Sequence, residues 1–587
     1  MKSRFLALSS LILLLVAVLF PANTPSAAAQ TTTHDIIIYG AGFGGVAAAL
    51  NAHRTYKDLS GTNPRILLIN PQSVVGGLGT LNGQNFWDWR RWDADKNTAT
   101  TYTQVTVNGI SIDKQPQMGN HAKYSVGTPV NGNPQFDQFY ATGEMATYLS
   151  NQLSANPGIT LLQPYDVKTV SRDATTGRIS AVSVQKLKRE NQAWLFDGAF
   201  AATSYTAPVF IDASENGRLT RLAGLTTTLG RQDRNSDNRQ MVASLMFRVK
   251  GINRNALVGQ PGWGQIVDKN GHVGFWGGNT EISNAVNAAV GTTLYPLGQF
   301  NKTNARYQIK AMNVAEDRTS TALAPASELE RVYWVNTLLI VGVDGNCERK
   351  DGCANEGATA YPTDGLKPWS TDYAFTQART TLDTPAFLNA MNAFPGFSGL
   401  QLMTVNAGGV LYPSVGESLY LRETIHTPLA PSSTYTDASF ALNASEVVGA
   451  GSRTATGTDE ANKANRIGLA YYWLDSNGYT KANPSSGQMD PDPISATLAN
   501  PVYIPVDAML TNQAPNLIVA GYSANISSRA WTMLRVLPNL TVLGDGAGVL
   551  AGYARSYQAD PLSFSSNASW LANVRNRIAI YGGRVDK

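Results

Sequence analysis

Three glycines directly behind an apolar segment are the residues whose spacing points most clearly to chemistry in this chain. The segment Ile36–Tyr39 runs into Gly40-x-Gly42-x-x-Gly45, and an alanine-rich stretch follows. In this pattern Gly40 permits a tight turn, Gly42 lets the backbone approach a phosphate, and Gly45 lets a helix pack close to the strand. The first N–H groups of such a helix attract anions. The sequence therefore predicts a strand, turn and helix that bind the diphosphate of a dinucleotide.

The ribose position of such a site is expected at the end of a second strand. Arg65–Ile69 is that predicted strand, and it ends in Asn70-Pro-Gln72. Nicotinamide-binding units place an acidic residue there to hold the ribose hydroxyl groups. Asn70 can hydrogen-bond a ribose hydroxyl without the charge assistance that an acid gives, and Gln72 is a second candidate.

The first 29 residues have the composition of an export signal. Lys2 and Arg4 precede an apolar run from Phe5 to Phe20, and Ala27–Ala29 fits a small-residue cleavage site. The apolar run is short for a membrane span and Pro21 follows it. We therefore expect an exported protein, periplasmic or secreted, with no stable membrane span after cleavage.

Composition indicates a large globular chain. Its 587 residues are enough for two or three domains, and a formal net charge of +4 without long basic runs predicts no nucleic-acid partner. Its two cysteines, Cys347 and Cys353, predict one local disulfide in an oxidising compartment. A redox-active dithiol is the alternative, but the spacing is not Cys-x-x-Cys. No metal site is expected.

Several further segments resemble one known family, and they occur in that family's order. Val75-Gly-Gly-Leu-Gly-Thr80 resembles the Gly-Gly-x-x-Thr segment that lies against the flavin in FAD-dependent oxidoreductases of the glutathione-reductase-like type. Asn516–Gly521 and Arg535-Val-Leu-Pro538 resemble the terminal strand and turn of the FAD-dependent oxidoreductase group that includes exported proteins labelled xanthan-lyase-like. The other matching segments are Phe210–Ser214, Leu419–Thr424 and Ile467–Ser476.

The resemblance implies an α/β fold in which discontinuous segments assemble a Rossmann-like FAD-binding domain of the glutathione-reductase type, beside an α+β substrate domain. The expected divisions are a signal peptide at 1–29, FAD-binding segments at 30–229 and 505–587, and a substrate or cap domain at 230–504. The cofactor would be non-covalent FAD. Its expected contacts are Gly40, Gly42, Phe43, Gly44, Gly45, Asn70, Gln72, Gly76, Gly77, Thr80, Val167, Arg535, Pro538 and Asn539.

The catalytic candidates are less well defined. His426 follows the Arg-Glu element and is the first candidate for a base, with His121 second; Arg422, Asp475 and Arg535 are the other candidates. Tyr471 and Tyr472 are rival proton-handling groups. The chain departs from the family at Asn70, at Gly217-Arg218 and at Asn477, where relatives often carry His. The resemblance therefore transfers the fold and cofactor better than the reaction.

The resulting interpretation is an exported FAD-dependent oxidoreductase that oxidises a small molecule or saccharide by hydride transfer to flavin N5, with oxygen or another electron acceptor. The aromatic and arginine cluster Asn85–Trp92 could contact such a substrate or simply pack in the core. One alternative is an FAD-dependent reductase or isomerase fed electrons by a partner. Another is a non-catalytic carbohydrate-binding protein with a vestigial flavin fold.

Overall fold

A computed structural model describes residues 31–87, 104–107, 110–113, 139–190, 192–234, 237–268, 271–362, 364–407, 409–449, 459–481, 498 and 501–587. The predicted signal peptide, most of the aromatic and arginine cluster, and His121 lie outside these residues.

Five parallel strands form the sheet that carries the glycine motif. The sheet order is β27-β11-β2-β3-β6, and every neighbouring pair is parallel. The strands are β2 (Ile36–Tyr39), β3 (Ile66–Ile69), β6 (Ile159–Leu162), β11 (Val209–Asp212) and β27 (Leu517–Val519). The strands predicted on both sides of the motif, and the closing strand from near the C-terminus, are confirmed.

The two faces of this sheet are covered by different structures, because side chains alternate along a strand. Ile36 and Ile38 point into a core shared with the helices. Ile37 and Tyr39 point into a second core with Val167 and Val182, on an antiparallel layer. A strand buried on both faces must be apolar throughout, which is why this segment of the sequence shows no polar alternation.

Helices α2 (Phe43–Ser60) and α11 (Leu537–Tyr557) pack closely together on the first face. Gly544, Gly548 and Gly552 recur every four residues along α11. A Cβ at Gly544 would overlap the backbone of Gly44, and one at Gly548 would overlap the carbonyl of Ala48. Residues without side chains therefore let the two backbones approach. The other helices of this part are α3 (Thr142–Ser154), α4 (Arg218–Leu222), α9 (Ala444–Gly449), α10 (Ser528–Leu534) and α12 (Ala568–Ile580).

The antiparallel layer on the other face is built from a hairpin and its neighbours. Its strands are β1 (Thr31–Thr33), β7 (Tyr165–Arg172), β8 (Ile179–Glu190), β9 (Ala193–Phe196) and β10 (Thr203–Thr206). Strands β7 and β8 form the hairpin, which turns between Arg172 and Ile179. The preceding segment Ile159–Leu162 belongs to the parallel sheet as β6, because it pairs with β3.

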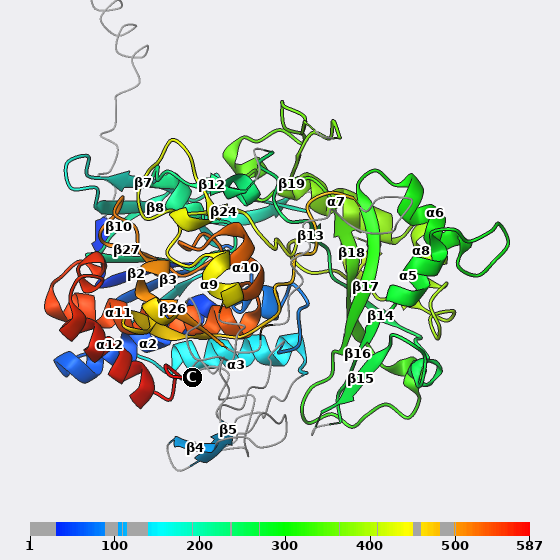
Figure 1. Ribbon diagram of the computed structural model, residues 1–587, viewed down its shortest axis with the longest axis horizontal. Coiled ribbons are helices and arrows are strands. Elements are labelled where there is room, and N and C mark those ends of the chain that lie inside the picture. The colour runs from blue at the N-terminus through cyan, green and yellow to red at the C-terminus, as the bar shows by residue number, and fades with distance from the viewer. Residues whose placement is uncertain are drawn as a thin grey trace, which may run out of the picture.

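A seven-stranded sheet forms the second part of the molecule, beside the first (Figure 1). Its strands are β13 (Ala243–Ser244), β14 (Phe247–Lys250), β15 (Gly264–Val267), β16 (Val273–Gly277), β17 (Tyr307–Glu316), β18 (Tyr333–Ile340) and β21 (Gln401–Leu402). Its helices are α5 (Asn279–Ala285), α6 (Tyr295–Thr303), α7 (Thr371–Leu382) and α8 (Pro385–Met391). The paired strands are antiparallel, and their apolar side chains and those of the helices form a separate core.

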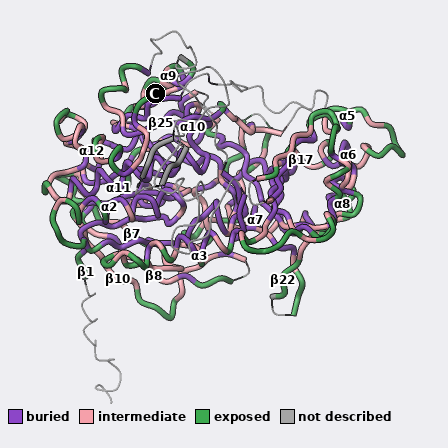
Figure 2. Tube along the Cα trace, turned by 90° about the horizontal axis from the view of Figure 1, so that it is seen from below, coloured by how far each residue is buried: buried purple, intermediate pink, exposed green. Residues whose placement is uncertain are grey.

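The chain returns to the first core well before residue 505. Strand β24 (Ile425–His426) pairs with β12 (Thr228–Leu229), and β25 (Arg466–Ala470) pairs with β26 (Val502–Pro505). Leu442 belongs to the first core. Packing thus ties residues from about 425 onward to the cofactor-binding part. Figure 2 shows buried chain through both parts, with exposed chain at β22. The smaller paired strands are β4 (Gln104–Val107), β5 (Ile110–Asp113), β19 (Val343–Asp344), β20 (Trp369–Ser370), β22 (Thr404–Ala407) and β23 (Val410–Pro413).

The predicted disulfide is confirmed: Cys347 and Cys353 are joined, with their Cα atoms 5.6 Å apart. No helix in the described ranges is long and apolar enough to cross a membrane. Within the same ranges, no group of three or more His, Cys, Asp and Glu side chains is placed to hold a metal ion.

Candidate cofactor and active site

A pocket opens at the carboxyl ends of β2, β3 and β11. Residues from the first turn of the sheet, from the loop after β3 and from the second part of the molecule line it. The predicted cofactor contacts that line it are Gly40, Gly42, Asn70, Gln72 and Gly77. Parallel sheets bind ligands at this edge because the loops that follow the strands diverge there.

The glycine turn has the geometry that a phosphate group requires. Gly40 has φ +93°, and a Cβ there would lie 2.8 Å from the backbone of Ala213. A Cβ at Gly45 would overlap the Gly40 carbonyl oxygen. A Cβ at Gly42 would instead project into open space. No side chain caps the N-terminus of α2, so this cradle fits a diphosphate.

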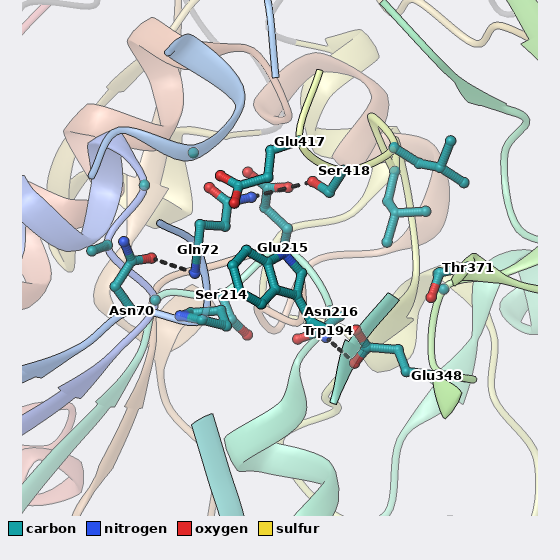
Figure 3. Close-up of a pocket in the computed structure, with 18 of the residues that line it drawn as sticks. Asn70, Gln72, Trp194, Ser214, Glu215, Asn216, Glu348, Thr371, Glu417 and Ser418 are labelled. Carbon is teal, nitrogen blue, oxygen red and sulfur yellow. Dashed lines mark hydrogen bonds between the residues drawn. The ribbon is translucent and has the colours of Figure 1, made fainter. Parts of the chain in front are cut away.

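The loop after β3 brings two amide side chains into the pocket (Figure 3). Asn70 Nδ2 donates to the Val74 carbonyl at 2.8 Å, and Gln72 Nε2 donates to Ser418 Oγ at 3.2 Å. The buried Gln72 Oε1 atom has no hydrogen-bond partner among the described residues. Asn70 therefore holds the loop, while Gln72 offers an acceptor suited to a ribose hydroxyl.

Other predicted cofactor residues support the cradle from outside the lining. Thr80 Oγ1 donates to the Val75 carbonyl at 2.8 Å, and Gly76 N donates to the Ala41 carbonyl at 2.7 Å. These bonds hold the Gly-Gly-x-x-Thr loop against the turn. Phe43 packs on Trp87 with ring centroids 5.0 Å apart, and Gly44 packs against α11.

The rest of the pocket lining includes residues that sequence reasoning missed. They are Gln192, Trp194, Glu215, Glu348, Lys350, Asp372, Glu417 and Ser418. Trp194 comes from β9, whereas Glu348 and Lys350 come from the loop between the two cysteines. The cysteine pair was the one sequence signal for these residues, because it marked a fixed loop without indicating what the loop contacts.

Ion pairs dock the cysteine-closed loop onto the cofactor-binding part. Arg218 donates to both carboxylate oxygens of Asp351, at 2.5 and 2.6 Å. Arg218 Nε lies 3.2 Å from Asp166, and Lys350 Nζ lies 2.9 Å from the same carboxylate. Burial would raise the pKa of Asp166, but Lys350 and Arg218 hold it below its usual range. Charged side chains thus connect the two parts beside the pocket.

Val167, one of the predicted FAD contacts, is not among the residues that line the pocket. Its N–H donates to Asp166 Oδ1 at 2.7 Å, and its carbonyl accepts from Arg218 Nε at 2.8 Å. Arg218 is a residue at which the chain departs from the family, and its side chain occupies the Val167 carbonyl oxygen through this hydrogen bond.

A group of side chains that we call the cationic cluster lies between the two parts. Its members are the three catalytic candidates Arg422, Asp475 and Arg535, together with Tyr420. Arg535 donates to Tyr420 Oη at 2.5 Å and to Asp475 Oδ2 at 2.6 Å. The Arg422 guanidinium lies 4.5 Å from the Tyr420 ring centroid. Burial, together with the Arg535 charge, lowers the pKa of Arg422 to about 10.

The N-terminus of α11 begins just behind Arg535. Pro538 stands in its first turn, where the N–H group that proline lacks would have no partner within the helix. Asn539 Nδ2 donates to the Met533 carbonyl at 2.8 Å, and Asn539 Oδ1 accepts from Tyr471 N at 3.3 Å. Asn539 therefore ties this turn to the segment that leads to Asp475.

His426 is fully buried and lies apart from the pocket lining. Its Nε2 atom is 3.2 Å from Glu423 Oε1, and its ring packs against Phe440 and Trp531. Trp531 Nε1 donates to the Arg422 carbonyl at 2.9 Å. In this position His426 supports the backbone beneath the cationic cluster.

A parallel sheet with a glycine turn, an uncapped helix and a pocket at its carboxyl edge is the arrangement of a dinucleotide-binding domain. The chain matches the FAD dependent oxidoreductase family over residues 35–568, and it belongs to that family. FAD is therefore its cofactor, and the protein is an FAD-dependent oxidoreductase. A comparison with curated proteins found no match.

Similar solved structures include several flavoproteins. A geranylgeranyl bacteriochlorophyll reductase-like protein from Thermoplasma acidophilum shares 10% identity, with 94% of this chain and 84% of that chain covered and a TM-score of 0.34. The myxobacterial chondrochloren halogenase shares 10% identity over 74% of each chain, with a TM-score of 0.31. The flavin-dependent monooxygenase PieE, solved with FAD and substrate, shares 10% identity over 53% of this chain and 43% of that chain, with a TM-score of 0.27.

Proposed function

We propose that this enzyme is exported and oxidises a small molecule or saccharide-type substrate, with oxygen or another extracellular compound as electron acceptor. The observation that carries the proposal is the cationic cluster, which lies at the N-terminus of α11 and between the two parts of the molecule. Bound FAD supplies hydride acceptance at N5 of its ring. The protein supplies binding, charge and a path for the substrate proton.

Arg535 and the N-terminus of α11 provide positive charge at the same place. The side chain of Arg535 is only 3% exposed, and a helix N-terminus carries a partial positive charge. Tyr420 and Asp475 raise the pKa of Arg535 against the lowering effect of burial. This arrangement would stabilise a negatively charged reduced flavin or a substrate anion.

Asp475 is the group that we propose as proton acceptor. Its side chain is 42% exposed, whereas Arg422, Arg535 and Tyr420 in the same cluster are buried. Arg535 fixes its orientation through the 2.6 Å ion pair. His426 has no comparable exposure, so we place the base at Asp475. A general base must be within reach of the proton that it removes.

The fold type and the export route are part of the same proposal. The five-stranded parallel sheet, with helices on one face and an antiparallel layer on the other, supports a glutathione-reductase-type FAD domain. The first 29 residues support export, and the Cys347–Cys353 disulfide suits an oxidising compartment. The absence of an acid at Asn70 and of His at position 477 does not disrupt the cradle.

The test is anaerobic bleaching of the bound flavin. The FAD-loaded protein is mixed with a panel of sugars, sugar acids and small alcohols, and loss of the visible flavin band identifies a substrate. With that substrate, Asp475→Asn should slow flavin reduction at least about a hundredfold, as expected when a general base is removed. Asp586→Asn, which changes an exposed carboxylate paired with Arg466, is the matched control and should reduce at the wild-type rate. Equal rates for all three proteins would contradict the role of Asp475.

A further inference from the structure

Glu215 brings a carboxylate to the point where the two glycine loops meet. It follows β11, lines the pocket, and lies with Gln72 and Glu417 in Figure 3. A Cβ built on Gly77 would lie 2.9 Å from Glu215 Oε1 and 3.2 Å from Gly42 Cα. The carboxylate therefore lies beside Gly42, where the motif lets a phosphate group approach the backbone.

The Glu215 carboxylate also uses a backbone donor of this cradle. Leu78 N, in the turn Gly77–Gly79, donates to Glu215 Oε1 at 3.0 Å. Backbone N–H groups at Gly-rich turns are the groups that bind phosphate oxygens in nucleotide sites. In the structure an acidic side chain takes that donor.

The charges around Glu215 do not favour a second anion. The charged groups that line the pocket from other elements are Glu348, Lys350 and Asp372 of the second part, and Glu417. Tyr522, which follows β27, interacts electrostatically with Glu215. Lys350 is already paired with Asp166 and Glu348. Glu417 accepts from Ser73 and lies near Arg189. Thr424 Oγ1 donates only to the Glu215 backbone carbonyl, at 3.5 Å.

We propose that Glu215 occupies a backbone donor of the phosphate cradle and makes the binding of FAD depend on protonation. Its carboxyl group must become neutral before the diphosphate can bind beside it. This inference rests on FAD as the cofactor. The neutral carboxyl group can then donate a hydrogen bond to a phosphate oxygen, whereas the ionised group repels it.

The electrostatic environment gives the direction and range of the effect. Burial raises the pKa of Glu215 to about 7, against the lowering effect of the Leu78 N–H bond. Below this pH most of the protein has a neutral carboxyl group, so FAD affinity should be constant. Above it, each pH unit leaves tenfold less of the neutral form, and FAD affinity should fall roughly tenfold per unit. The diphosphate keeps its charge throughout.

The experiment measures FAD binding by calorimetry on the full chain freed of flavin. Titrations between pH 6 and pH 9 give the dissociation constant, and two buffers with different ionisation heats at pH 8 give the proton uptake. Wild-type protein should take up about one proton per FAD at pH 8 and lose roughly a hundredfold in affinity from pH 6 to pH 9. Glu215→Gln should take up none and bind with the same affinity at every pH.

Glu417→Gln is the matched control. It removes another acid that lines the same pocket, and burial raises the pKa of that acid as well. It should leave the proton uptake and the pH slope in place. A flat wild-type profile, a slope retained in Glu215→Gln, or the same flattening in Glu417→Gln would each overturn the proposal. Absence of proton uptake by the wild type would overturn the proposal even if a variant fails to fold.

Failure of the cofactor assignment would give a different result. Absence of FAD binding at pH 6 as well as at pH 9 would overturn both the inference about Glu215 and the proposed function. FAD binding with no pH dependence would overturn the inference alone.

Discussion

The two walls of the cofactor pocket are built in different ways. The wall at Gly40, Gly42 and Gly77 is made of backbone, and its shape follows from residues within one strand–turn–helix unit and the loop that pairs with it. The wall at Trp194, Glu348 and Lys350 is made of side chains from a β-hairpin and a disulfide loop. A backbone wall can be recognised from local spacing, whereas a side-chain wall depends on long-range docking.

Breaking the side-chain wall should have the largest effect on stability. Arg218→Met leaves Asp351 without its bidentate partner and removes one of the two cations that pair with the buried Asp166. Removal of one partner from a buried ion pair costs about 3–5 kcal/mol. Urea unfolding should show this loss in the free energy of unfolding. Lys463→Met, which breaks the exposed pair with Glu460, is the control and should unfold like the wild type. An equal loss of unfolding free energy in both variants would contradict a special role for the buried ion pairs.

In the backbone wall, substitution of two glycines should have different effects: one should lower the stability of the protein and the other should lower its affinity for FAD. Gly45→Ala introduces a Cβ that overlaps the Gly40 carbonyl oxygen, and overpacking of this kind costs about 1–3 kcal/mol. Gly42→Ala introduces a Cβ into open space, so the unfolding temperature should stay near that of the wild type while FAD affinity falls at least about tenfold. Thermal unfolding of the flavin-free proteins, together with FAD titration, measures both. Tight FAD binding by Gly42→Ala would show that the phosphate does not approach there.

Opening the disulfide loop should destabilise the protein less than Arg218→Met does, and its effect should extend to the pocket. The Cys347→Ser, Cys353→Ser double variant frees a loop with a sequence separation of six, and closure of so short a loop contributes about 2 kcal/mol. Because Glu348 and Lys350 lie in this loop and line the pocket, FAD affinity should fall as well. Wild-type protein treated with reductant should match the variant in unfolding and FAD affinity, and the variant itself should not respond to reductant. A reduced wild type with unchanged FAD affinity would separate the loop from the pocket.

The sequence allowed most of the first part of the fold to be predicted. Strands at Ile36–Tyr39 and Leu517–Val519, the turn at Gly40 and the proline in the first turn of α11 are present, because each depends on local backbone requirements. The Arg535–Asp475 pair joins two predicted candidates that lie 60 residues apart. The segment of each residue resembles a family element, whereas their contact depends on the tertiary fold.

The missed residues have a common physical cause. Glu215 directly follows the recognised Ile-Asp-Ala-Ser segment, yet only its contact with Leu78 and Gly77 shows where its carboxylate lies. Lys350 reaches the pocket through docking of the second part on the first, and Trp194 reaches it through the pairing of β9 with β8. Neither contact leaves a periodicity in the sequence. The position of His426 just after the Arg-Glu element made it the first candidate for a base, but its burial against Trp531 depends on tertiary packing.

The most direct test of the account is the visible spectrum of the purified protein after incubation with FAD at pH 6 and removal of excess cofactor. We predict flavin bands that move to the supernatant on denaturation in the wild type, and bands that are absent or much weaker in Gly42→Ala. Wild-type protein without flavin bands, or bands that remain with the denatured protein, would contradict non-covalent FAD bound in this pocket.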